Sequence, residues 1–225
     1  MHDYDFKLKL ILCGESGVGK STFFNHLKFK SLQTPLPIYQ NRNSIETTPT
    51  VGVDFLTSNK IYNNLNVKLH VWDTAGQEKY RTIISSYFKD ISACIIIFDL
   101  TNIKSLEHVP YWCSIANTYC TCEHKHPIFL FGNKNDLFYK KNLIDENIIN
   151  NCIKENDIFH YQSISSIDGS FDDKNFMHKL IDTILNKKYI SPCKGISTKE
   201  NENYITLNDN IQQNNKKEKK CCTIS

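Results

Sequence analysis

The chain has 225 residues, of which 40% are hydrophobic and 23% are charged. These values are ordinary for a globular protein and exclude collagen-like, coiled-coil and wholly disordered chains. No apolar run approaches the roughly 18 residues of a membrane span, and the acidic N-terminus lacks the hydrophobic stretch of a secretory signal. Nine cysteines without regular spacing then indicate reduced thiols.

The net charge of +3 is unevenly distributed. Residues 187–225 contain 8 lysines and 4 acidic residues, which leaves 19 basic and 20 acidic residues in the rest of the chain. A nearly neutral body argues against nucleic acid as a partner, because nucleic-acid binding requires a basic face. The basic tail favours an anionic membrane as the partner surface.

Hydrophobic patterning predicts that strands alternate with helices, which indicates a three-layer α/β fold. The run from Phe6 to Leu12 alternates and then becomes fully apolar, as in a strand that enters a buried sheet. Asn63 and Asn64 predict a hairpin between the next two strands. We expect the two hairpin strands at 55–61 and 67–72, and later strands at 93–98 and 127–131. Helices are expected at 21–30, 79–88, 105–122, 143–155 and 173–187. Residues 31–49 are expected to form a loop.

The periodicity stops near residue 190, where Asn, Lys, Gln and Thr begin to dominate. We therefore expect one folded domain over 1–190. A disordered tail is expected over 191–225, because this composition offers little apolar surface to bury.

A glycine-rich segment follows the first strand and precedes the first helix. It matches the phosphate-binding pattern G-x-x-x-x-G-K-S. Glycines let backbone N–H groups turn toward phosphate oxygens, and the N-terminus of the helix adds a positive dipole end. Lys20 is expected to reach the β- and γ-phosphates, and the Ser21 hydroxyl is expected to ligate Mg²⁺. The nucleotide-binding residues predicted here are Gly14, Ser16, Gly17, Val18, Gly19, Lys20, Ser21 and Thr22.

The stretch from Val71 to Glu78 places an acidic residue at the end of an apolar strand. Asp73 is suited to hold Mg²⁺, the N–H of Gly76 can face a γ-phosphate, and Gln77 can orient an attacking water.

A further candidate segment follows the strand at 127–131 and reads Gly132-Asn133-Lys134-Asn135-Asp136. The Asp136 carboxylate can accept hydrogen bonds from N1–H and the 2-amino group of guanine. Adenine offers no such pair, so a site of this kind selects guanine strongly.

In combination, these motifs resemble the Ras superfamily of small GTPases. The stretches from Thr50 to Phe55 and from Tyr80 to Phe88 resemble the Rab branch. The similarity covers residues 6–187. It implies a P-loop NTPase fold, with a six-stranded, mostly parallel sheet and helices on both faces.

The resemblance also implies roles for single residues. Thr50 is expected to bind Mg²⁺ and the γ-phosphate in the GTP state, and it joins Lys20, Gly76 and Gln77 in the catalytic set. Asn133 and Asp136 are expected to hold guanine, with the stem of Lys134 along the base.

Three departures from the family pattern lie within this similarity, one of which is that the stretch from Ser165 to Phe171 is about one residue longer than in the family. Ser21 and Thr50 are 29 positions apart, which is more than is usual in the family. The Ser-Ala-Lys guanine motif of the family appears as Ser163-Ile164-Ser165, so the Ile164 N–H is expected to donate to guanine O6.

The chain ends in a basic segment with paired cysteines. Cys221 and Cys222 resemble a double geranylgeranylation site, but the last four residues also match C-a-a-X with a terminal serine, which favours farnesylation. Cys221 is then available for palmitoylation. Either scheme gives two membrane signals, because the lysines at 216, 217, 219 and 220 attract anionic lipid.

The resemblance implies a monomeric GTPase that binds GTP or GDP with Mg²⁺ and hydrolyses GTP slowly without a partner. Its implied partners are an exchange factor, a GTPase-activating protein, effectors at both switches and an escort protein for the prenylated form. The implied location is the cytoplasmic face of an intracellular membrane engaged in vesicle traffic. Two alternatives remain open: a nucleotide-binding scaffold with little activity, and a P-loop kinase or ATPase.

Overall fold

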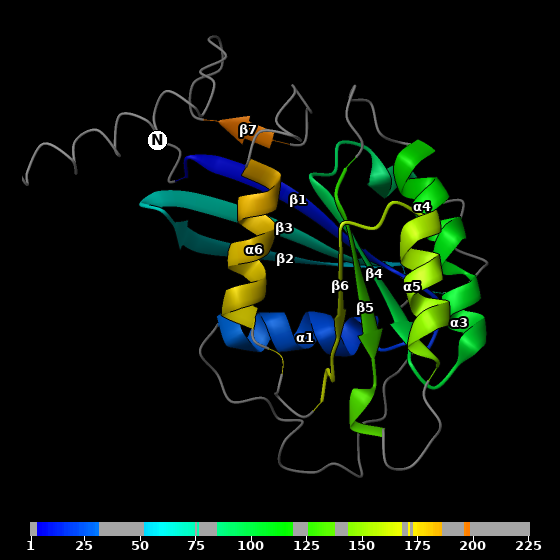
Figure 1. Ribbon diagram of the computed structural model, residues 1–225. Helices are drawn as coiled ribbons and strands as arrows, with labels where there is room; N and C mark the ends of the chain where they lie inside the picture. Colours follow the sequence, from blue (N-terminus) through cyan, green and yellow to red (C-terminus); the bar gives the residue numbers. More distant parts are fainter. Residues whose placement is uncertain are drawn as a thin grey trace, which may run out of the picture.

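The computed structural model describes residues 4–31, 52–74, 76, 85–118, 126–137, 144–167, 171, 173–185 and 196–198. One sheet lies between two layers of helices (Figure 1). The strands are β1 Phe6–Cys13, β2 Val53–Tyr62, β3 Leu65–Thr74, β4 Ala93–Asp99, β5 Ile128–Asn133, β6 His160–Ser163 and β7 Ile196–Thr198. The helices are α1 Lys20–Ser31, α3 Ile103–Glu107, α4 Val109–Thr118, α5 Glu146–Glu155 and α6 Asp173–Leu185, with short 3₁₀ helices η3 Ser85–Phe88 and η4 Asn135–Leu137.

The sheet has the strand order β2-β3-β1-β4-β5-β6. Its pairs are parallel except β2 with β3, and β7 adds an antiparallel pairing to β1. This arrangement confirms the expected α/β class with a mostly parallel six-stranded sheet. Because the chain proceeds in opposite directions on the two sides of β1, ligands are expected where the carboxyl ends of β1 and β4 diverge.

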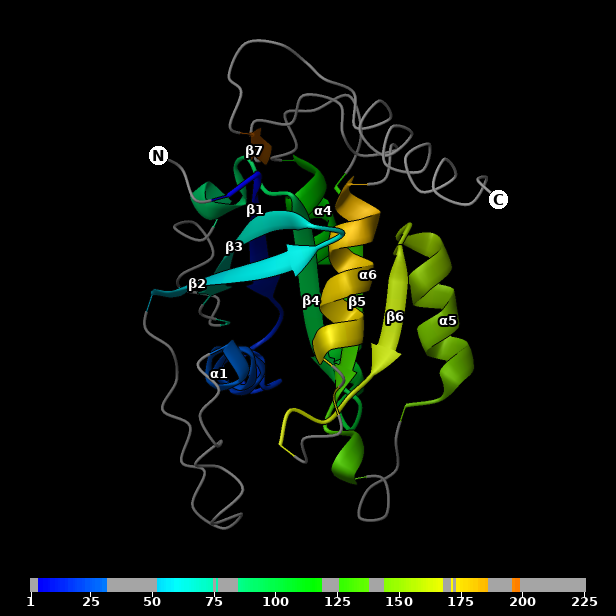
Figure 2. The ribbon, with the colours of Figure 1, turned by 90° about the vertical axis from the view of Figure 1, so that its left-hand side faces the viewer.

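Two hydrophobic cores cover the two faces of the sheet. The first joins α1 and α6 to β1, β3 and β5, and the second joins α4 and α5 to β4 and β5. In Figure 1, α1 and α6 lie on one side of the sheet and α4 and α5 on the other, and Figure 2 looks onto the side of α6. Every residue of β4 and β5 is buried, which explains why both strands are short continuous apolar runs.

The predicted hairpin is confirmed at the turn between β2 and β3. Asn63 and Asn64 have φ angles of 47° and 65°. A two-residue turn with two left-handed residues matches the twist of the flanking strands, and asparagine tolerates this conformation better than most residues.

The single helix expected over 105–122 is instead divided into α3 and α4 at His108. Pro110 has no N–H to donate to the carbonyl of Leu106, and the His108 N–H bonds that carbonyl. The proline therefore interrupts the helix, and the residues after 118 lie outside the described part.

Two strands were not identified from hydrophobic patterning. β6 is a four-residue strand whose side chains are half-buried or exposed, so it carries no apolar signal. β7 lies within the predicted tail and pairs Phe6 with Thr198 and Leu8 with Ile196. The rest of the tail after residue 198 lies outside the described residues, so its expected disorder stays a prediction.

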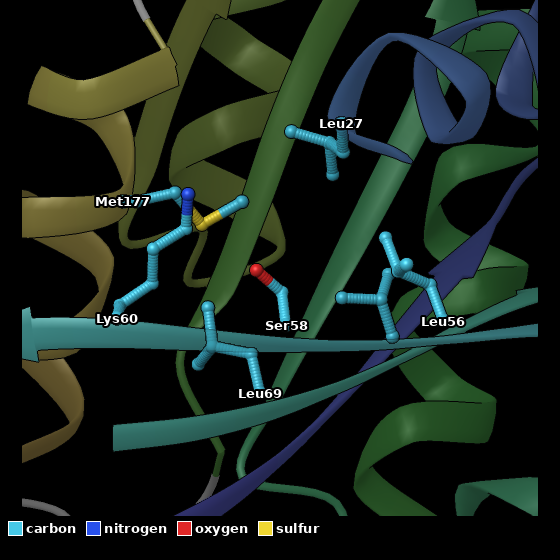
Figure 3. A pocket seen from close by; sticks show the side chains of 7 residues that line it. Leu27, Leu56, Ser58, Lys60, Leu69 and Met177 are labelled. Carbon is cyan, nitrogen blue, oxygen red and sulfur yellow. The ribbon is translucent and has the colours of Figure 1, made fainter. Parts of the chain in front are cut away.

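A small pocket lies between β2, β3 and the helices α1 and α6 (Figure 3). Ser58 and Lys60 bring polar groups to it, while Leu27, Leu56, Leu69, Val71 and Met177 make its walls aliphatic. Among its lining residues only Lys60 is titratable, and in an open α/β sheet ligands bind at the carboxyl ends of the strands instead.

Candidate nucleotide-binding site

The phosphate loop connects β1 to α1 and depends on three glycines in unusual conformations. Gly14, Gly17 and Gly19 have φ angles of 136°, 78° and 99°. A Cβ on Gly14 would overlap the carbonyl oxygen of Ile97, and a Cβ on Gly19 would overlap the Asn133 amide. Such a turn at the start of a helix can bring backbone N–H groups around an anion.

Lys20 begins α1 and is only 5% exposed. Its ammonium donates to the carbonyl oxygens of Gly14 at 2.9 Å and Glu15 at 2.8 Å. Burial lowers the pKa of Lys20, while Asp73 acts in the opposite direction. An ammonium has three donors, so one remains for a phosphate oxygen beyond these two bonds.

Asp73 lies near the end of β3 and is 1% exposed. Burial raises its pKa to about 6, against the opposing effects of the Ser21 hydroxyl bonded to it and of Lys20. Within the described residues, its Oδ1 is buried without a hydrogen-bond partner. A carboxylate and a hydroxyl with an unused buried oxygen fit Mg²⁺, which prefers hard oxygen ligands and retains several waters.

Gly76 is buried against the phosphate loop. A Cβ on Gly76 would lie 2.7 Å from both the carbonyl carbon and the carbonyl oxygen of Glu15, and it would overlap the Lys20 ammonium. The structure therefore brings this residue to the phosphate site, as expected. Thr50 and Gln77 lie outside the described residues.

Asn133 ends β5 and is 2% exposed. Its side-chain amide donates to the Val18 carbonyl at 2.8 Å. Its oxygen accepts from the N–H of Ser166 at 3.0 Å and from the Ser166 hydroxyl at 2.9 Å. One side chain thus joins the phosphate loop to the segment after β6.

Asp136 and Lys134 follow Asn133 at the mouth of this site. Asp136 is exposed, and one of its carboxylate oxygens accepts from the Ser165 hydroxyl at 2.7 Å. Lys134 has a φ angle of 69°, and its ammonium lies 2.7 Å from the Asp99 carboxylate.

The expected contact from Ile164 to guanine is corrected by the structure. The Ile164 N–H donates to the Gly132 carbonyl at 2.8 Å, so the edge of the sheet already uses it, and Ser163 is exposed within β6. Ser165 and Ser166 instead contact Asp136 and Asn133. Among the described residues, Ser165 and Ser166 therefore contact the two side chains expected to hold guanine, in place of Ser163 and Ile164.

Two acidic residues of this site were missed by sequence reasoning. Burial alone would raise the pKa of Asp99, but hydrogen bonds from Lys134 and Thr101 outweigh it, so the pKa is lowered. Glu15 in the phosphate loop lies 2.9 Å from the imidazole of His108. Asp99 could have been identified from the sequence, because it ends an apolar strand next to the site.

Other expected features have no further support in the described residues. Those residues contain no cluster of three or more histidine, cysteine or acidic side chains arranged for a metal ion. Cys221 and Cys222 lie outside the described ranges. No helix of the described part is both long and apolar enough to cross a membrane.

Comparisons with known proteins agree with this geometry. The Ras family model matches residues 9–187. The chain is 35% identical over 137 residues to the GTP-binding protein ypt3 of Schizosaccharomyces pombe, covering 61% of this chain and 58% of that relative. It is 30% identical over 212 residues to the Ras-related protein RABA2a of Arabidopsis thaliana, covering 94% and 87%.

A third relative is the Ras-related protein Rab-19 of Mus musculus, with 38% identity over 142 residues, 63% of this chain and 59% of that relative. The chain thus spans less than two thirds of the ypt3 and Rab-19 relatives. The family match nevertheless covers the phosphate loop, Asp73, Asn133 and Asp136. The chain belongs to the Ras family as a Rab-like small GTPase.

Proposed function

We propose that this protein is a GTP-dependent switch in vesicle traffic, which binds GTP or GDP with Mg²⁺ and recruits effectors in its GTP state. The observation that carries the proposal is the position of Asn133. Its amide joins the phosphate loop at Val18 to Ser166, next to the exposed Asp136 carboxylate. A site linked in this way supports recognition of the phosphates and the base of one nucleotide together.

Guanine selectivity rests on Asp136. Its carboxylate accepts from N1–H and the 2-amino group, and the Ser165 hydroxyl restricts its orientation. The change Asp136→Asn should shift the preference toward xanthine, because an amide can donate to the 2-carbonyl of xanthine. Competition between GTP and XTP measures this shift, and an unchanged preference for GTP would place the guanine site elsewhere.

The proposed hydrolysis uses residues from three segments. Lys20 holds the β- and γ-phosphates, Ser21 and Asp73 hold Mg²⁺ with Thr50 in the GTP state, and Gln77 orients the attacking water. Bound Mg²⁺ would neutralise charge that develops on the phosphate oxygens. The proximity of Gly76 to the loop supports a contact between its N–H and the γ-phosphate, which is present only with GTP.

Effector recruitment is proposed at residues 50–55 and 77–88. Phe55 is 42% exposed, and its ring centroid lies 4.7 Å from that of Trp72, which lies 5.4 Å from that of Tyr87. These connected aromatic side chains suit a protein partner, because aromatic residues dominate interface energetics. An exchange factor and a GTPase-activating protein would control the two states.

Membrane attachment is proposed through Cys221 and Cys222, carrying two prenyl chains or a farnesyl and a palmitoyl chain. The flanking lysines add attraction to anionic lipid. The protein would then act on the cytoplasmic face of an intracellular membrane and return to the cytosol with an escort protein. Intact-mass measurement of the tail determines the number of lipids.

Two measurements test the central proposal. In competition binding, GTP and GDP should displace a labelled guanine nucleotide while ATP should not. In single-turnover hydrolysis, Gln77→Leu should retain binding and lose rate. Selective guanine binding without hydrolysis would support the scaffold, and displacement by ATP would favour the kinase or ATPase reading.

A further inference from the structure

The two faces of β2, β3 and β1 differ sharply in burial. On the face toward α1 and α6, alternate residues of the three strands are buried in the first core. On the opposite face, the alternate residues are half-buried or exposed over most of their length. In Figure 1, α3, α4 and α5 gather beside β4, β5 and β6 instead. Much of the second face is therefore accessible.

Strand register concentrates basic residues on this accessible face. Lys7 of β1 pairs with Lys68 of β3, and Lys9 pairs with His70. Paired residues in adjacent strands share one face of a sheet. We call Lys7, Lys9, Lys68 and His70 the basic sheet face.

Charge on the basic sheet face is poorly compensated. Within the described part of the chain, no carboxylate forms an ion pair with Lys7 or Lys68, and the Lys68 ammonium lies 4.8 Å from the centroid of the Tyr4 ring. The neighbouring Asp5 accepts from the Asn66 N–H at 2.7 Å. Like charges directly opposite one another destabilise a sheet. A bound anion would therefore reduce the electrostatic repulsion between Lys7 and Lys68.

Lys9 and His70 complete the basic sheet face, and the negative charge of Asp90 partly compensates that of Lys9. Lys9 donates to the Lys89 carbonyl at 2.7 Å and lies 5.6 Å from the centroid of the Trp72 ring. Burial, followed by the charges of Lys7 and Lys68, lowers the pKa of His70. This lowering agrees with an excess of positive charge around the imidazole.

Apolar side chains adjoin one end of the basic sheet face. Trp72 follows His70 by two positions on β3, and Phe55 pairs with Trp72 from β2. Alternate residues along a strand are about 7 Å apart, which is also the spacing of alternate side chains in an extended peptide. An extended segment can therefore place apolar residues over Phe55 and Trp72 and acidic residues over the lysines.

We propose that the basic sheet face docks an extended acidic segment of a protein partner, whose apolar end covers Phe55 and Trp72. Protein is favoured over membrane because the cations repeat with the period of a strand and adjoin paired aromatic rings. The proposal rests on the proposed effector surface, because Phe55 and Trp72 belong to both, and it extends that surface onto four basic residues of β1 and β3.

The test uses a fluorescent peptide in which glutamates alternate with serines after a leucine–phenylalanine pair. The full chain should bind it in fluorescence anisotropy at low salt and release it as salt screens the charges. The double change Lys7→Glu and Lys68→Glu should weaken binding about tenfold, because two attractive contacts become repulsive. A peptide with glutamine in place of glutamate should not bind.

The matched control is the double change Lys104→Glu and Lys154→Glu, which alters net charge equally on exposed positions of α3 and α5. It should leave affinity unchanged. Equal weakening by this control, equal binding of the glutamine peptide, or binding of phosphatidylserine vesicles without binding of the acidic peptide would overturn the proposal. Lys7→Gln with Lys68→Gln, checked by thermal unfolding, provides a milder pair if charge reversal prevents folding.

Discussion

The phosphate half and the base half of the candidate site are built in different ways. The phosphate half is one continuous segment from Gly14 to Ser21, whose shape depends on glycine backbones. The base half brings together the ends of β4, β5 and β6 through the side chains of Asp99, Asn133 and Ser165. A backbone-built site should be intolerant of a Cβ wherever its backbone passes close to another segment, whereas a side-chain-built site should lose stability one contact at a time.

The largest effect is expected from Gly14→Ala. Its φ angle of 136° is unfavourable for alanine, and the new Cβ would overlap a backbone carbonyl that cannot move away. We expect the free energy of unfolding to fall by at least about 3 kcal/mol. Urea denaturation at fixed GDP concentration measures it.

Gly17→Ala is the matched control for Gly14→Ala, because φ is 78° and no atom lies within 4 Å of the added Cβ. It should cost about 1–2 kcal/mol of unfolding free energy. Equal losses in the two variants would contradict the view that close backbone approach shapes the phosphate half.

A smaller loss is expected from Asn133→Ala, which removes the link between the two halves. The Val18 carbonyl and the Ser166 N–H and hydroxyl would lose their Asn133 partner, at a cost of about 2–3 kcal/mol of unfolding free energy. Urea denaturation and the rate of GDP release should both report it. Asn135→Ala, at an exposed neighbouring position, should change stability by less than about 0.5 kcal/mol.

Asp99→Asn tests the base half alone. Loss of the charge opposite Lys134 should reduce stability and GDP affinity by about 1 kcal/mol. Because folding lowers the pKa of Asp99, its contribution is present above the ordinary carboxyl pKa near 4 and is lost as the pH falls below it. In a Lys134→Met background, Asp99→Asn should change stability and GDP affinity little. A full loss of stability there would assign the contribution of Asp99 to its hydrogen bonds with Thr101 instead.

The smallest effect is expected from the contact between Glu15 and His108. The His108 side chain is 50% exposed, so a double-mutant cycle should give a coupling below about 1 kcal/mol. GDP release from Glu15→Gln, His108→Gln and the double variant measures it. A larger coupling would show that side chains also shape the phosphate half, which would weaken the contrast between the two halves.

The same contrast explains what could be predicted from sequence. The phosphate loop was located because its glycines and Lys20 are adjacent in the chain, and the buried strands β1, β4 and β5 were located because they are apolar. The contacts of Ser165 and Ser166 were not predicted, because β6 is a polar edge strand and several serines within a few residues leave its end undefined. Pro110 did carry a readable signal for the division between α3 and α4. The partner of Lys134 depended on how β4 and β5 lie side by side.

The pairing of β7 with β1 changes the geometry of any membrane tether. A chain that leaves the domain at Leu185 has 36 residues to reach Cys221, or about 120 Å when fully extended. A chain held at Thr198 has 23 residues, or about 80 Å. While β7 stays paired, a lipid anchor at Cys221 or Cys222 would apply its tension at Phe6 to Leu8, at the opposite end of β1 from the phosphate loop. The pairing between β7 and β1 would then have to break before the tension could reach α6.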